Sequence, residues 1–110
     1  MARNYLKEIG YAILEMNFRF KMGEIDLIAQ DGQTVCFIEV KTRKSLAQGS
    51  PFEAVHAWKV RKLSRMAVLY LKLKYRSLEI PSRFDVIAIT YGRDGAPRIE
   101  HLKNAFDSAF

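Results

Sequence analysis

Residues 24–30 and 33–41 are rich in Ile, Leu, Val, Phe and Thr, with an Asp-Gly dipeptide at 31–32 between them. This composition is typical of strands, and Asp-Gly is a strong signal for a two-residue hairpin loop. We therefore expect two antiparallel strands in which Gln30 faces Gln33. Charged residues interrupt both strands, which is unusual because charges taken out of water need a partner.

The charged residues of this hairpin share one face. Side chains alternate along a strand, so the pattern predicts Glu24, Asp26, Glu39 and Lys41 on the same side of the sheet. Asp26 and Glu39 are expected as diagonal neighbours, with Cβ atoms roughly 7–8 Å apart, a span that one divalent ion can bridge. The alternative is a surface ion pair between Glu39 and Lys41, with Asp26 bound to a nearby loop.

The rest of the pattern predicts the order α-β-β-β-α-β-β. Ser50, Pro51 and Glu53 form a capping box that begins the longer helix, and Pro97 suggests that the last strand lies at an edge. A helix between two apolar strands predicts a parallel crossover. The expected fold is α/β (α+β), a mixed central sheet flanked by helices. Its further elements are a helix at 2–9, a strand at 11–20 with Ala12, Leu14, Met16, Phe18 and Phe20 on one side, a helix at about 50–75, strands at 84–91 and 98–102, and a helical turn at 104–110.

The longer helix has two different sides. Between Lys41 and Arg76 there are ten basic residues and one acidic residue, whereas a solvated helical surface usually mixes the two signs. The excess favours contact with phosphates. The apolar arc comprises Val55, Leu63, Met66, Ala67, Tyr70 and Leu73, and the basic stripe comprises Arg61, Arg65, Lys72 and Arg76.

Composition narrows the class of protein. The chain has 110 residues, 49% of them hydrophobic, and a net charge of +6, which predicts one domain and suggests polyanionic partners. Cys36 lies among apolar strand residues, so we interpret it as a small buried hydrophobe in a cytoplasmic protein. There is no apolar run of transmembrane length and no signal peptide, so we expect no membrane partner.

Other polar and aromatic residues are weaker candidates. Asp85 opens an apolar strand after Arg83, and a local ion pair or cap is a better explanation for it than catalysis. His101 has no second His or Cys at metal-ligand spacing. Trp58 and Tyr70 could stack on bases, although aromatic residues at helical spacing usually belong to the core.

Several motifs together resemble a known group of proteins. The strand pattern D-x12-E-x-K is similar to that of the PD-(D/E)XK nuclease superfamily, which has the restriction-endonuclease-like fold. The whole chain resembles the YraN-like family of small predicted endonucleases. The motifs that carry this resemblance are A-x-x-Y-L-x-x-x-G-Y from Ala2 to Tyr11, GEIDLIA at 23–29, FIEVKTR at 37–43, GSPFEAV at 49–55 and RFDVIAI at 83–89.

The resemblance implies a metal-dependent endonuclease that hydrolyses phosphodiester bonds in DNA, including branched or flap structures. Asp26 and Glu39 would hold Mg²⁺ or Mn²⁺, with the backbone carbonyl of Val40 as a further ligand and Lys41 beside the attacking water. DNA is a better candidate than RNA, and analogy with small nucleases that cut two strands adds a homodimer as a hypothesis. The residues expected to bind nucleic acid are Arg43, Lys59, Arg61, Arg65 and Lys72.

Two departures from the family pattern bear on activity. Ile25 stands where the superfamily pattern has proline. Relatives also carry a glutamate on an earlier part of the first helix, so we expect residues 1–110 to form one nuclease-like domain that lacks the start of this helix. Glu24 points to the same face and is a candidate replacement ligand. Two alternatives therefore stay open, a non-catalytic nucleic-acid-binding module of the same fold and a protein-interaction domain whose basic helix meets an acidic partner.

Overall fold

The computed structural model describes residues 1–43 and 57–108. Two helices and five strands follow one another in the expected order α-β-β-β-α-β-β, so the predicted fold class is confirmed. The elements are α1 (Ala2–Glu8), β1 (Ala12–Phe20), β2 (Gly23–Asp31), β3 (Thr34–Arg43), α2 (Ala57–Tyr75), β4 (Ser82–Tyr91) and β5 (Pro97–Phe106).

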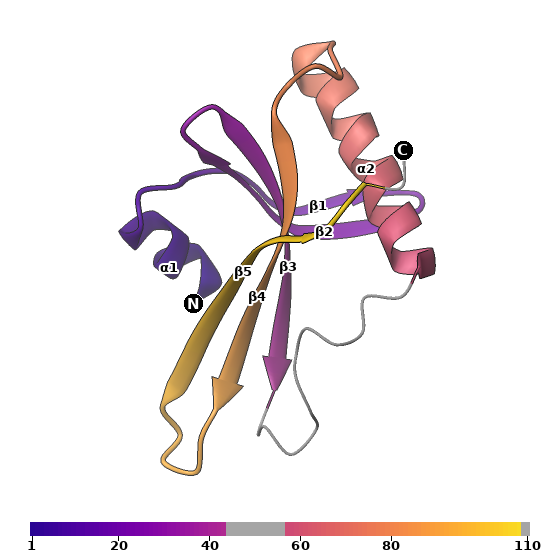
Figure 1. The fold of residues 1–110 in the computed structure, drawn as a ribbon. Helices are drawn as coiled ribbons and strands as arrows, with labels where there is room; N and C mark the ends of the chain where they lie inside the picture. Colours follow the sequence, from indigo (N-terminus) through magenta and orange to yellow (C-terminus); the bar gives the residue numbers. More distant parts are fainter. Residues whose placement is uncertain (44–56, 109–110) are drawn as a thin grey trace.

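The five strands form one mixed sheet in the order β1-β2-β3-β4-β5. All neighbours are antiparallel except β3 and β4, which are parallel and are joined through α2 as the pattern predicted. Helix α1 lies on one side of the sheet and α2 on the other (Figure 1). No helix among residues 1–43 and 57–108 is long and apolar enough to cross a membrane.

The predicted register of the central hairpin is wrong by two residues. Asp31 pairs with Thr34, so the loop consists of Gly32 and Gln33 rather than Asp31 and Gly32. Gly32 has φ 60° and occupies the first loop position, where a type II′ turn needs glycine. Because the shift is an even number of residues, Leu27 and Ile28 keep their predicted faces. Ile25 does not, because it packs in the same cluster as Ile28 and not with Leu27, so the alternation breaks next to Asp26.

Strand β1 does not alternate as predicted. Its register with β2 shifts between Ile13 and Glu15, and Asn17 has φ 52°. The extra residue at the register shift and the unusual backbone of Asn17 each break the alternation of side chains. As a result Met16 is 49% exposed, whereas Leu14 and Phe18 pack against the core as predicted. Phe20, at the end of the strand, is 45% exposed instead of facing the core.

Two apolar clusters lie on opposite sides of the sheet. The first packs α2 against residues such as Ile28 and Phe37, and the second packs Leu6 of α1 against residues such as Ile38 and Ile87. Cys36 is fully buried in the second cluster, as predicted for a free thiol that serves as a hydrophobe, and burial raises its pKa to about 11.

Most of the predicted apolar arc of α2 is correct. Leu63, Met66, Ala67 and Tyr70 are buried. Leu73 is 64% exposed, and Leu71 is buried in its place, because the buried arc is centred further toward Ser64. The helix ends at Tyr75, as expected. Two further predictions lie outside the described residues. They are the capping box at Ser50, Pro51 and Glu53 and the place of Val55 in the apolar arc.

The predicted helical turn at 104–110 is wrong. Strand β5 continues to Phe106, because pairing with β4 extends to Phe84 opposite Phe106. The Phe106 ring still packs on the core, stacked on Phe84 at 4.8 Å between centroids. Phe110 lies outside the described residues. The prediction that β5 is an edge strand is confirmed.

Candidate metal and nucleic-acid site

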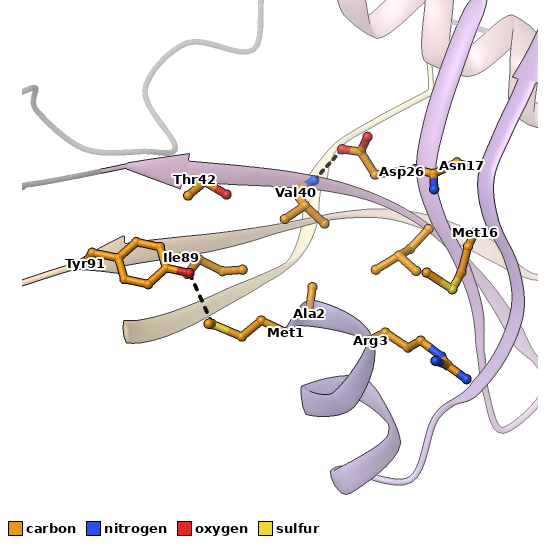
Figure 2. A pocket seen from close by; sticks show the side chains of 11 residues that line it. Met1, Ala2, Arg3, Met16, Asn17, Asp26, Val40, Thr42, Ile89 and Tyr91 are labelled. Atoms are coloured by element: carbon orange, nitrogen blue, oxygen red, sulfur yellow. Dashed lines mark hydrogen bonds between the residues drawn. The ribbon is translucent and has the colours of Figure 1, made fainter. Parts of the chain in front are cut away.

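The candidate site lies where β2 and β3 separate. Their pairing ends at Leu27 opposite Ile38, and continuing this register places Asp26 opposite Glu39, where we had predicted a diagonal arrangement. Beyond this point the backbone N–H of Val40 donates to Asp26 Oδ2 at 2.8 Å (Figure 2). The side chain of Asp26 therefore takes the place of a strand partner.

This hydrogen bond also fixes the direction of the Val40 carbonyl. The N–H and C=O groups of one strand residue point toward the same neighbouring strand. Since the Val40 N–H points toward Asp26, its carbonyl oxygen points to the same side, away from β4. Two oxygen donors, a carboxylate and a backbone carbonyl, thus face the opening between β2 and β3.

Glu39 lies on the face of the sheet that α2 covers. Its Oε1 forms an ion pair with Lys59 Nζ from the first turn of α2, and only 11% of its side chain is exposed. Its other oxygen, Oε2, is buried and has no hydrogen-bond partner in the part of the chain that the structure describes. A buried carboxylate oxygen without a partner is costly, so this position favours a cation or a donor.

Burial and several nearby charges act on the pKa of Asp26. Burial is the main reason why the pKa of Asp26 is raised above its ordinary value of 3.8, and the nearby charges of Glu39 and Glu24 raise it further. The Val40 N–H and the Lys59 ammonium act in the opposite direction. A desolvated carboxylate with negative neighbours is an environment that a divalent cation would relieve.

The predicted ligand set is only partly assembled. Within residues 1–43 and 57–108, no group of three His, Cys, Asp or Glu side chains is close enough to hold a metal ion. Glu24 is near enough to influence Asp26 but pairs with Arg19, at 3.5 Å between Nε and Oε2. Of the predicted site residues, Asp26 and Glu39 lie close enough for their charges to interact. Lys41 is two residues after Glu39 in β3, so strand alternation directs it to the same face.

A pocket of about 400 Å³ opens beside Asp26 on the other side of the sheet. The first residues of α1 line it together with Thr42 and Tyr91, and Figure 2 shows α1 approaching from the side opposite to the Asp26 carboxylate.

The predicted nucleic-acid-binding residues divide into two groups. Arg61, Arg65 and Lys72 are exposed on the outer side of α2. Lys59 instead lies on the side of α2 that faces the sheet, one turn before Leu63, and reaches Glu39. Arg43 ends β3 and is half-buried.

Sequence reasoning missed the exposure of Trp58. Helical spacing favours the core for this residue, with stacking on bases as the alternative, but 58% of it is exposed, with Lys62 Nζ 6.0 Å from the centre of its ring. Tyr70 is buried, as expected for a core aromatic residue. The signal that could have separated them is helical phase, since Trp58 follows the basic stripe and Tyr70 follows the apolar arc.

A second polar cluster surrounds Asp85, which is fully buried. It accepts hydrogen bonds from Arg83 Nε at 3.0 Å, from His101 Nε2 at 2.8 Å and from the Asn104 N–H at 3.1 Å. Burial alone would raise the pKa of Asp85, but these donors outweigh it and hold the pKa below its ordinary value. The local ion pair predicted for Asp85 is confirmed, and because its hydrogen bonds are satisfied we interpret the cluster as structural.

Comparison with known proteins identifies a family. A model described as "Uncharacterised protein family UPF0102" matches residues 1–89. A UPF0102 protein of Geotalea uraniireducens is 48% identical over 106 residues, which cover 96% of this chain and 83% of the relative. One from Geobacter sulfurreducens is 46% identical over 110 residues, covering 100% and 85%. One from Symbiobacterium thermophilum is 49% identical over 105 residues, covering 96% and 88%.

Proposed function

This chain belongs to the UPF0102 family, and we propose that it is a Mg²⁺- or Mn²⁺-dependent nuclease of the PD-(D/E)XK type that hydrolyses phosphodiester bonds in DNA. The observation that carries the proposal is the buried Oε2 of Glu39, which has no hydrogen-bond partner among residues 1–43 and 57–108. Continued beyond Leu27 and Ile38, the register of β2 and β3 places Glu39 opposite the desolvated carboxylate of Asp26. Two carboxylates in this setting suit a hard divalent cation, which prefers oxygen ligands.

The metal would be held by Asp26, Glu39 and the Val40 carbonyl. Mg²⁺ commonly uses only one or two protein carboxylates and keeps several waters, so a set smaller than three side chains is compatible with it. When bound, the ion would neutralise charge on the scissile phosphate and make water more acidic. Glu24 is the candidate for a further ligand, on condition that it releases Arg19.

Lys41 would orient the attacking water and help to remove its proton. It shares the face of Glu39 because the two residues are separated by one position along β3. Its ammonium would also stabilise negative charge that develops on the phosphate oxygens. Arg61, Arg65 and Lys72 would hold the nucleic-acid backbone along the exposed side of α2, and Arg43 would add a contact at the end of β3.

A second candidate function is a nucleic-acid-binding module without catalysis. It is favoured by the ion pair between Lys59 and Glu39, in which an internal ammonium takes the position of a cation. It is also favoured by the absence of a three-ligand group in the described ranges 1–43 and 57–108. In this case DNA binding would depend on the basic stripe and not on Asp26.

Cleavage assays distinguish the two functions. End-labelled single-stranded, duplex, flap and four-way-junction DNA would be incubated with the protein and Mg²⁺ or Mn²⁺, alongside Lys41→Ala and Asp26→Ala made in the same way. Cleavage by the wild type and none by the variants supports the nuclease. Binding without cleavage by all three supports the module, and equal cleavage by all three identifies a contaminating enzyme. The molar mass of the protein alone in solution tests whether the chain forms a homodimer.

A further inference from the structure

We infer that the groove between the β1–β2 turn and α2 binds an unpaired nucleic-acid strand, with Trp58 as a stacking platform for a base. The inference deepens the proposed function and rests on it for the identity of the partner. It names the class of substrate, a nucleic acid with a single-stranded segment beside the Asp26 and Glu39 carboxylates.

The groove combines positive charge with exposed apolar side chains. It has a volume of about 620 Å³ and is open to solvent. Phe20 and Met22 are 45% and 40% exposed, and the two lie next to each other in the lining of the groove. The lining residues are Arg19, Phe20, Lys21, Met22, Gly23, Glu24 and Lys62.

Lys62 connects this groove to Trp58. Its ammonium lies over the Trp58 ring at 6.0 Å, and its aliphatic stem lies so close to Gly23 that a Cβ at position 23 would collide with it. Trp58 and the β1–β2 turn therefore flank the same lysine. In Figure 1 this turn runs beside α2, away from α1. Lys62 is thus the contact that links Trp58 to the lining of the groove.

This surface adjoins the candidate metal site. Trp58 directly precedes Lys59, whose ammonium pairs with Glu39. At the other end, Glu24 lines the groove and its charge influences Asp26. A strand that followed the groove would pass the two carboxylates. Glu24 is the single acid among the groove's lining residues, and Arg19 pairs with it.

The chemistry favours an unpaired strand over a duplex. Bases in a duplex are stacked on each other and present only their edges, whereas an unpaired base has a free face for an aromatic side chain. Exposed aromatic rings beside lysines and arginines are the combination that single-strand-binding surfaces use. A surface for duplex backbone alone would need the cations but not Trp58, Phe20 and Met22.

Trp58 provides the test, because it is the only tryptophan in the chain. Its fluorescence would be titrated in EDTA with oligothymidylate, with oligouridylate and with a blunt DNA duplex. The absence of metal keeps this measurement independent of cleavage. We expect strong quenching by the single strands and several-fold weaker binding of the duplex. Tighter binding of either the DNA or the RNA oligomer supports the inference and names the preferred sugar.

Variants of Trp58 and Lys62 test which side chains bind the single strand. Binding of a fluorescein-labelled oligomer, measured by anisotropy, should weaken about 5- to 150-fold in Trp58→Ala, the range for loss of one stacked base. Trp58→Phe should retain most of the affinity. Lys62→Ala should weaken binding more than the charge-matched control Lys7→Ala, which lies on α1 across the sheet. Circular dichroism checks that each variant is folded.

Three results would overturn the inference. They are unchanged fluorescence with both single strands, equal affinity of Trp58→Ala and the wild type, and duplex binding as tight as single-strand binding. Cleavage of DNA combined with any of these would leave the nuclease proposal intact. Conversely, Trp58-dependent binding without cleavage would support this inference and contradict the nuclease proposal.

Discussion

The ammonium group of Lys59 on α2 forms an ion pair with the carboxylate of Glu39 on β3, and this pair closes one side of the candidate metal site. The Glu39 side chain is largely removed from water, at 11% exposed, whereas 35% of the Lys59 side chain is exposed. A divalent cation that used Glu39 would have to compete with Lys59. The positive charge of Lys59 also offsets a small part of the rise in the pKa of Asp26 that burial causes.

Removal of the Lys59 charge should therefore strengthen metal binding. We expect Lys59→Met, which keeps an unbranched side chain but removes the ammonium group, to bind Mn²⁺ about three- to tenfold more tightly, because one competing charge near the site is gone. Isothermal titration calorimetry measures this affinity. Without metal, the variant should lose about 1–3 kcal/mol of unfolding free energy, because both Glu39 oxygens then lack partners.

Lys72→Met is the matched control for Lys59, since Lys72 is exposed on the same helix. Its metal affinity should equal that of the wild type. An unchanged or weaker Mn²⁺ affinity in Lys59→Met would show that the two cations do not compete for Glu39.

Asp26→Asn should stabilise the protein at neutral pH in EDTA. The pKa of Asp26 is raised in the folded state, so between its ordinary value of 3.8 and this raised value the folded state binds more protons than the unfolded state. The contribution of Asp26 to stability is therefore greatest at low pH and is lost as pH rises through the folded pKa. Asparagine keeps an oxygen that can accept the Val40 N–H but carries no charge to desolvate.

Urea unfolding of the wild type and Asp26→Asn from pH 3 to pH 7 measures this difference. The gain in stability of the variant should grow with pH in EDTA and shrink when Mg²⁺ is added, because the ion stabilises only the wild type. A constant gain across the pH range would contradict desolvation of Asp26.

Asp85→Ala should destabilise the fold by about 3–5 kcal/mol, because it leaves the buried part of Arg83 and the Asn104 N–H without their acceptor. The pKa of Asp85 is held below its ordinary value of 3.8, so its stabilising contribution is present above that pH and is lost as pH falls through the folded pKa. Urea unfolding at pH 7 is the measurement, with the exposed Asp107→Ala as control. A loss below 1 kcal/mol would show that the cluster is not structurally important.

Neutralisation of the basic stripe should reduce the salt dependence of DNA binding. In the triple variant Arg61→Ala, Arg65→Ala and Lys72→Ala, the slope of log K against log salt for duplex DNA should fall by about 2.7, or 0.9 for each phosphate contact that is lost. Fluorescence anisotropy, measured from low to physiological salt, gives the slope.

The control is a triple alanine variant of Arg93, Arg98 and Lys103, which are exposed in the β4–β5 turn and on β5. It has the same net charge as the stripe variant and should keep the wild-type slope. Equal slopes for the two variants would exclude specific contact with the stripe.

Local features of the sequence determined the order of the elements and, in β3 and most of α2, the faces of their side chains. The strand residues around the Asp-Gly dipeptide predicted a hairpin, and alternation along β3 correctly put Glu39 and Val40 on opposite faces, because alternation depends only on neighbouring residues. The helical period located the exposed Arg61 and Arg65 and the end of α2 at Tyr75 for the same reason.

Only the tertiary structure decided which residues meet. The register of the hairpin followed from the turn conformation at Gly32, and the continuation of β5 to Phe106 followed from pairing with Phe84. The partner of Glu39 is Lys59, because the packing of α2 on the sheet sets its angle and therefore the reach of its first turn. Such relationships join segments that are distant in the chain. They depend on the shape of the whole core, which no local pattern of residues contains.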